Sequence, residues 1–270
     1  MIKATKLKSQ PPKRLKPRPE KIEILTYKFR YLNRIQFQTL LHYKSKDKIN
    51  RLLNKLAEQK YLRKYEIESF PRTANIYSLG TMGRKYFLEH REIKDINHPL
   101  LDRVWDERGY SSKFQKHCMF LGNIYISLVN LVKTVDGGKG KLNFFTKTDL
   151  TGVEHMIYKL PDCYFSIEDR AGNSQGYLLD IIDIYTPRPK LKRRIGQYIS
   201  YYQRKSWQKY ISPTFPEIIF VYPDISIKNY MQKKIKKMLE QEMEKMLFYL
   251  TSWDEVKKEG LNSSTLHLVK

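Results

Sequence analysis

The chain contains few cysteines and no long hydrophobic run. Cys118 and Cys163 are the only two cysteines, and they form no CxxC motif. This excludes a disulfide framework and a zinc cluster, and we expect a protein of the reducing cytoplasm. The most apolar stretch, 119–132, is shorter than the roughly 20 residues of a membrane span and contains two asparagines. No membrane is therefore expected among the partners.

Acidic residues are also scarce. There are 28 Asp and Glu against 51 Lys and Arg, which gives a formal net charge of +23. Such an excess is self-repelling unless a polyanion shares the surface, so nucleic acid is the first partner to consider. The imbalance is steeper in residues 1–100, at +15, than in residues 101–270, at +8. Residues 1–21 hold eight basic residues, one acidic residue and four prolines, and we expect a flexible basic arm there, not a secretory segment.

Several enzyme signatures are missing. The Gly-Gly-Lys-Gly-Lys run at 137–141 lacks the spacing of a phosphate-binding loop and leads toward a strand. No GxSxG is present, and none of the six histidines forms the pair, separated by one apolar residue, that a rolling-circle initiator or relaxase of the HUH type needs. Any of the 20 tyrosines could be a nucleophile, but nothing in the sequence singles one out.

The first hundred residues show a recurring helical pattern followed by two extended segments. Apolar residues at helical spacing predict a helix from about 20 to 30. Asn33 and Ser45 are expected N-caps of two further helices. The third helix has an apolar stripe at Ile49, Leu52, Leu53 and Leu56. A strand pair at 61–67 and 75–79 follows, and a helix at 81–92 closes the pattern.

Three helices and a hairpin predict a winged helix-turn-helix domain over residues 22–98, with a boundary near Asn97-His98-Pro99. In that arrangement the third helix enters the major groove, where lysines contact phosphates and Arg51, Asn50 and Asn54 can read base edges. The alternative is a solvated basic face that serves only protein contacts. The expected DNA contacts are Lys44, Lys46, Lys48, Asn50, Arg51, Asn54, Lys55, Arg63 and Arg72, and Lys64 adds charge to the wing.

Residues 99–270 predict a second domain of mixed α/β or α+β class. The pattern is a helix, three strands, a helix and a strand, followed by a long helix and a last strand. The expected ranges are 112–133 for the first helix, 142–148, 157–167 and 177–185 for the strands, 188–207 and 218–222 for the next helix and strand, and 227–250 and 265–269 for the last two elements.

Two strand positions resemble the PD-(D/E)xK nuclease superfamily, whose core has the same αβββαβ order. Pro161-Asp162 lies on the second predicted strand, and Asp180 lies near the end of the third. The resemblance implies that Asp162 and Asp180 hold Mg²⁺ or Mn²⁺ if the site is competent, because two carboxylates suit a hard cation. Gln197-Tyr198-Ile199-Ser200-Tyr201 is similar to the QxxxY element of RecB-like members.

The chain departs from this superfamily at the motif lysine. The expected position holds Ile182, or Tyr185 if Asp183 is the second carboxylate. Lys190 lies on the following helix, seven residues before Gln197 and on the same face. It is the remaining candidate for the role of the motif lysine. The catalytic candidates are thus Asp162, Asp180, Gln197 and Lys190. The alternative is that both aspartates are polar residues at strand ends of a decayed or unrelated fold, with no cofactor.

The predicted helix 188–207 carries basic residues that no acidic residue compensates. Like charges on one helix repel each other, which indicates that a polyanion lies here too. The expected DNA contacts on this helix are Lys192, Arg193 and Arg194.

Taken over residues 20–225, the chain resembles the replication-relaxation proteins of plasmids and other mobile elements. The resemblance depends on the Tyr-Arg-rich first helix, the run 116–125, the Pro161-Asp162 strand and the late Arg-rich helix. It implies a DNA-binding protein that acts in replication or mobilisation, with other proteins of those processes as partners. Two functions remain open: a DNA-binding protein whose nuclease-like domain does not cut, and a magnesium-dependent endonuclease targeted by the winged helix.

Overall fold

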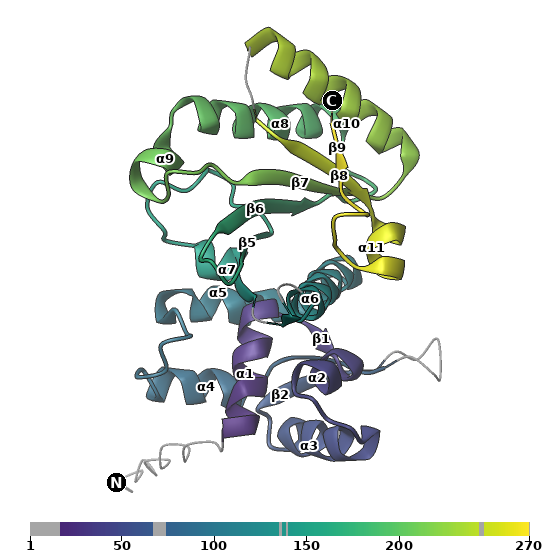
Figure 1. Cartoon of the computed structure of the whole chain (residues 1–270). Helices are drawn as coiled ribbons and strands as arrows, with labels where there is room; N and C mark the ends of the chain where they lie inside the picture. Colours follow the sequence, from purple (N-terminus) through teal and green to yellow (C-terminus); the bar gives the residue numbers. More distant parts are fainter. Residues whose placement is uncertain (1–16, 67–73, 135–136, 139, 243–245, 270) are drawn as a thin grey trace, which may run out of the picture. The chain divides into compact units, whose positions relative to one another are not determined.

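The computed structural model describes residues 17–66, 74–134, 137–138, 140–242 and 246–269. The chain, shown in Figure 1, divides into two compact units, Met1–Met119 and Phe120–Lys270. The division falls within helix α6 (Ser112–Val132), later than the predicted boundary. Ile96 and Leu101, on either side of the predicted boundary, are buried in one core cluster of the first unit. The first unit therefore continues past Pro99.

The first unit consists of helices around a small antiparallel sheet with the strand order β1–β3–β2. Helix α1 begins at Pro17, so residues 17–21 belong to this helix and not to the predicted arm. Residues 1–16 and Arg72 lie outside the described residues. The elements are α1 (Pro17–Phe29), β1 (Leu32–Asn33), α2 (Arg34–Leu40), α3 (Lys46–Glu58), β2 (Leu62–Tyr65), β3 (Ile76–Leu79), α4 (Thr81–Glu89), η1 (His98–Leu100), α5 (Leu101–Asp106) and η2 (Glu107–Gly109).

Both predicted N-caps of the first unit are confirmed. The Asn33 side chain accepts a hydrogen bond from the backbone N–H of Gln36 at 2.9 Å, and the Gln36 side chain accepts one from the Asn33 N–H at 2.9 Å. Ser45 Oγ accepts a hydrogen bond from the Lys48 N–H at 3.4 Å. Each cap satisfies an N–H that the first helical turn leaves without an intrahelical partner.

The apolar stripe of α3 determines which side of the helix faces the core. Ile49, Leu53 and Leu56 are buried, whereas Leu52 is only partly buried. Because these residues recur at helical spacing, they cover one side of α3 and leave the opposite side to solvent.

The second unit is a mixed six-stranded sheet with the order β4–β5–β6–β7–β8–β9, and its mixed α and β class was predicted. Strands β6, β7 and β8 are parallel, and the other neighbours are antiparallel. After α6 the elements are β4 (Lys141–Thr146), α7 (Lys147–Leu150), β5 (Cys163–Glu168), β6 (Ser174–Ile181), α8 (Arg188–Gln203), α9 (Ser206–Tyr210), β7 (Glu217–Tyr222), α10 (Ile225–Glu242), β8 (Phe248–Ser252), α11 (Trp253–Glu259) and β9 (His267–Leu268).

Helices cover both faces of this sheet. Figure 1 shows α8 and α10 on one face, where Leu191 of α8 and Met231 of α10 are buried with Leu178 of β6. The last turns of α6 lie on the other face, where the rings of Tyr125 and Phe144 are 4.9 Å apart. None of the helices in the described ranges combines the length and hydropathy needed to cross a bilayer.

Several predicted elements have different bounds in the structure; the strand predicted over 177–185 ends at Ile181, and the helix predicted over 188–207 ends at Gln203, before α9. The strand predicted over 157–167 begins at Cys163, because Pro161 has no N–H to donate and Lys159 adopts a φ of 60°, outside the β region. The helix predicted over 227–250 ends at Glu242, and its last residues belong to β8. Phe248 and Leu250 are both buried, which is the two-residue period of a strand.

Candidate functional site

The exposed side of α3 carries the residues predicted to contact DNA. Asn50 is half-buried, and the other predicted residues of this helix point to solvent. Asp47 is also exposed in the first turn and lowers the net charge of this side. The exposed predicted contacts of the helix and of the turn before it are Lys44, Lys46, Lys48, Arg51, Asn54 and Lys55.

The hairpin β2–β3 adds less free charge than the sequence predicts. Arg63 is exposed, and its guanidinium lies 5.0 Å from the ring centroid of Tyr65. Lys64 forms an ion pair with Glu66 at 2.8 Å, and the hydrogen bond to this carboxylate raises the pKa of Lys64. Of the hairpin residues described, Arg63 is therefore the stronger candidate for a phosphate contact.

Asp180 and Arg194 form a buried ion pair under helix α8. Arg194 Nε donates to Asp180 Oδ2 at 2.5 Å, and Arg194 Nη2 donates to Asp180 Oδ1 at 3.0 Å. Tyr198 Oη donates to Asp180 Oδ2 at 2.9 Å. The side chains of Asp180 and Arg194 are only 11% and 13% exposed. A planar guanidinium thus binds both oxygens of the carboxylate and fixes its orientation.

Asp162 lies beside this pair, one residue before β5. Its backbone N–H donates to Leu179 O at 3.0 Å, and its carboxylate Oδ2 accepts a hydrogen bond from the Ile181 N–H at 2.8 Å. The charge of Asp162 also contributes to the raised pKa of Arg194. The two predicted carboxylates are therefore neighbours, as the resemblance implies, and the group between them and α8 is Arg194.

The pKa shifts indicate that Arg194 keeps its positive charge and that Tyr198 keeps its proton. Burial is the largest influence on the pKa of Arg194 and acts to lower it, but the electrostatic attraction of Asp180, Tyr198 and Asp162 and the hydrogen bond to Asp180 together outweigh burial, so the pKa is raised. Burial, followed by the charge of Asp180, raises the pKa of Tyr198 well above its ordinary value. Tyr198 is therefore a neutral hydrogen-bond donor, and Arg194 is a cation at every ordinary pH.

This donor set does not fit a divalent cation. A hard cation takes six or more oxygen ligands, and both Asp180 oxygens are already bonded to Arg194. A metal bound here would also face a guanidinium that is only 13% exposed. No group of three or more Asp, Glu, His or Cys side chains in the described part of the chain is placed to hold a metal ion.

The remaining predicted residues of this site have other positions. Lys190 is exposed, and it is Arg194, one turn later, that reaches Asp180. Gln197 Oε1 lies 3.4 Å from Arg194 Nη1. The sequence predicts Arg194 as a DNA contact. In the structure its guanidinium is buried against Asp180, so it is not available to DNA. Tyr198 lies within the QxxxY-like element, but its hydrogen bond to Asp180 was not predicted; its place one turn after Arg194 was the available signal.

The outer side of α8 and the short helix α9 remains strongly basic. No Asp or Glu occurs between Arg188 and Tyr210. The exposed basic residues are Arg188, Lys190, Lys192, Arg193, Arg204, Lys205 and Lys209. The predicted contacts Lys192 and Arg193 are thus available to a polyanion.

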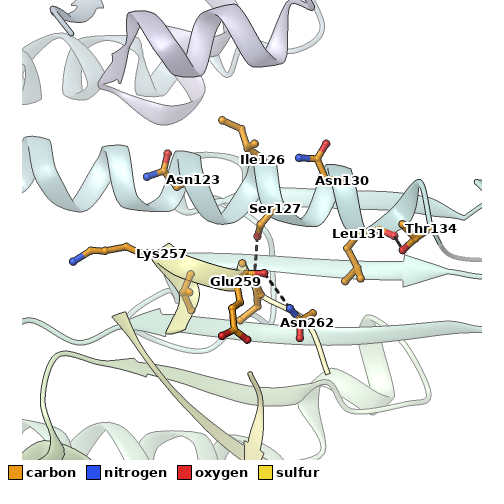
Figure 2. Close-up of a pocket in the computed structure, with 12 residues that line it drawn as sticks. Asn123, Ile126, Ser127, Asn130, Leu131, Thr134, Lys257, Glu259 and Asn262 are labelled. Atoms are coloured by element: carbon orange, nitrogen blue, oxygen red, sulfur yellow. Dashed lines mark hydrogen bonds between the residues drawn. The ribbon is translucent and has the colours of Figure 1, made fainter. Parts of the chain in front are cut away.

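A separate cleft of about 510 Å³ lies in the second unit between α6 and the segment around α11. Figure 2 shows Asn123, Ser127 and Asn130 of α6 along one wall. Ser127 Oγ accepts a hydrogen bond from the Leu261 N–H at 3.2 Å, and Asn262 Nδ2 donates to Glu259 O at 3.1 Å. None of the 12 lining residues belongs to the predicted site.

Comparison of the chain with family models, with curated proteins and with solved structures gave no match.

Proposed function

We propose that this chain is a DNA-binding protein that acts in the replication or mobilisation of a plasmid or other mobile element. The observation that carries the proposal is the exposed basic side of α3, opposite the buried residues Ile49, Leu53 and Leu56. A capped helix whose apolar side is anchored in a core presents its outer side rigidly. That is what reading a groove requires.

The order of elements in the first unit supports a winged helix-turn-helix. The chain runs α1, β1, α2, α3, β2, β3, and the strand order is β1–β3–β2. In this proposal α2 and α3 form the helix-turn-helix, α3 enters the major groove, and the β2–β3 hairpin contacts the backbone beside it.

We assign the second unit to a nuclease-like module that binds DNA without cutting it. The order α6, β4, β5, β6, α8, β7, interrupted only by the short helices α7 and α9, and the neighbouring carboxylates of Asp162 and Asp180 support the nuclease-like part. The ion pair between Asp180 and Arg194 supports the absence of cleavage. The exposed cations of α8 support a second, sequence-independent contact with the phosphate backbone.

The link to a mobile element is supported by the resemblance to replication-relaxation proteins over residues 20–225. Partners would then be other replication or mobilisation proteins. The second candidate function, a magnesium-dependent endonuclease, is favoured by one observation: Asp162 and Asp180 are neighbours at the end of β6. It requires Arg194 to leave Asp180, because the metal and the guanidinium compete for the same oxygens.

Fluorescence anisotropy with labelled duplex DNA tests the proposal. We expect affinity to fall steeply as salt rises, because each phosphate neutralised adds close to one unit to the log-log slope. Lys46→Ala should weaken binding to all duplexes about equally, whereas Arg51→Ala should reduce preference for the cognate site. Lys94→Ala is the matched control, since Lys94 is an exposed lysine of the same unit outside α3 and the hairpin. A flat salt response, or equal losses for Lys94→Ala and Lys46→Ala, contradicts the proposal.

A further inference from the structure

Tyr158 is the most exposed large apolar or aromatic side chain among the described residues, with 83% of its surface accessible. The residue before it, Ile157, is 4% exposed and belongs to the core cluster under α8. The side chains of Ile157 and Tyr158 therefore point in different directions, the first into the core and the second to solvent. A single exposed ring is common on protein surfaces and needs further support before a role is assigned.

The loop that carries Tyr158 is fixed on both sides. Tyr201 Oη donates to His155 O at 2.8 Å, and Arg194 Nη1 donates to Lys159 O at 2.5 Å. The His155 ring also stacks on Tyr210, with centroids 3.8 Å apart and planes at 15°. Helices α8 and α9 therefore hold this loop through three separate contacts.

The backbone on either side of Tyr158 is strained. His155 has a φ of 63° and Lys159 has a φ of 60°, in the left-handed region that side chains other than glycine rarely adopt. Such conformations persist when the surrounding contacts determine them, and they cluster at ligand-binding sites. Here the contacts to His155 O and Lys159 O are the ones that determine them. The backbone that carries Tyr158 is consequently held in place without a ligand.

Exposed lysines occur in this loop and on the helix that holds it. Lys159 is exposed, and Lys190, one turn from Arg194 on α8, is exposed as well. Glu154 is the one acidic residue between Thr151 and Pro161. A second exposed ring, Tyr185, is 77% accessible in the connection from β6 to α8. That connection leaves β6 at the end of the strand where the Tyr158 loop enters β5, because Cys163 pairs with Leu179.

We infer that Tyr158 is a stacking platform for an unpaired nucleobase, with Lys159 and Lys190 contacting the phosphates beside it. The inference deepens the proposed function and rests on it: the DNA bound by the second unit is single-stranded or locally melted. In a duplex each base is covered by its neighbours, so only an unpaired base can offer its face to a tyrosine ring. Arg194 is a positioning residue in this site, because it holds Lys159 O and does not reach the nucleic acid.

The test compares two labelled DNAs, a fully paired duplex and the same sequence with a short unpaired bubble. Tyr158→Ala should weaken binding to the bubble about tenfold and leave the duplex affinity nearly unchanged, since stacking on an aromatic ring is lost. Tyr158→Phe keeps the ring and should bind the bubble like the unmodified protein. Val153→Ala is the matched control, because Val153 is 44% exposed in the same loop and not aromatic.

A second readout follows the base itself. A 2-aminopurine placed in the bubble should lose fluorescence on binding, and Tyr158→Ala should restore it. Bubble binding that Tyr158→Ala leaves intact, or that Tyr158→Phe damages as much as Tyr158→Ala, overturns the stacking role while the proposed DNA binding stands. Equal losses for duplex and bubble also overturn it. If neither DNA is bound by the unmodified protein, the proposed function itself fails.

Discussion

Two buried carboxyl groups, Glu23 in the first unit and Asp180 in the second, have opposite surroundings. Glu23 is 0% exposed, and neither of its carboxyl oxygens has a hydrogen-bond partner within the part of the chain that is described. Burial raises its pKa well above the ordinary value. Asp180 is 8% exposed but accepts three hydrogen bonds from Arg194 and Tyr198.

The comparison shows that burial by itself does not decide what a carboxyl group does. Without a cation, Glu23 avoids the cost of a buried charge by keeping its proton. With Arg194 against it, Asp180 is half of an ion pair, and its oxygens are committed to that partner. A carboxylate at a strand end is therefore a metal ligand only if its neighbours leave it available.

The largest expected effect comes from removing the cation. Arg194→Ala should destabilise the second unit by about 3–5 kcal/mol, because Asp180 is left as a buried charge without its partner. Arg193→Ala changes an exposed residue of the same helix and should cost less than about 0.5 kcal/mol. Urea unfolding of both variants checks the difference. Similar losses for the two would mean that the pair contributes little.

A smaller effect is expected where the chain packs against Glu23. A Cβ added at Gly83 would lie 2.4 Å from Glu23 Oε2 and 2.6 Å from Tyr61 O. Gly83→Ala should therefore destabilise the first unit by about 1–3 kcal/mol through overpacking. Gly109 has no atom within 4 Å of an added Cβ, so Gly109→Ala is the control. Thermal unfolding that ranks the two variants equally would contradict the close packing of Glu23.

The smallest expected effect concerns pH. Since the folded pKa of Glu23 is raised above its ordinary value of 4.5, the folded chain holds a proton that the unfolded chain releases. The stability from this group is fully present below pH 4.5 and is lost as pH rises through the raised value. Glu23→Gln should remove this loss, so that the hydrogen-exchange protection of α1, corrected for the intrinsic exchange rate, changes less as the pH rises above 4.5. The control is Glu58→Gln, at an exposed glutamate of α3. An unchanged pH dependence in Glu23→Gln would show that the carboxyl group is not protonated.

Local signals in the sequence predict the parts of the fold that depend on local physics. The caps at Asn33 and Ser45 depend on a side chain and an N–H three residues apart, so sequence spacing is enough to find them. The core stripe of α3 is similar: Ile49, Leu53 and Leu56 recur at helical spacing and are buried.

The sequence does not reveal features that depend on which elements meet. Arg194 is one of several basic residues on α8, and only the packing of this helix over β6 pairs it with Asp180. In the loop around Tyr158, His155 and Lys159 are left-handed although neither is glycine, so their residue types do not reveal these turns. Glu23 lies on a helix with an apolar side, and it is buried because a second side of α1, with Thr26 and Tyr27, is also covered.

Incubating the protein with supercoiled DNA and Mg²⁺ or Mn²⁺ tests most directly whether the chain binds DNA without cutting it. Binding is followed by mobility shift, and nicking is followed by conversion to the open circle. We expect a shift without nicking above background, and the same result for Asp162→Ala, because the guanidinium of Arg194 occupies Asp180 in both proteins. Metal-dependent nicking that Asp162→Ala abolishes would contradict this account and establish the endonuclease.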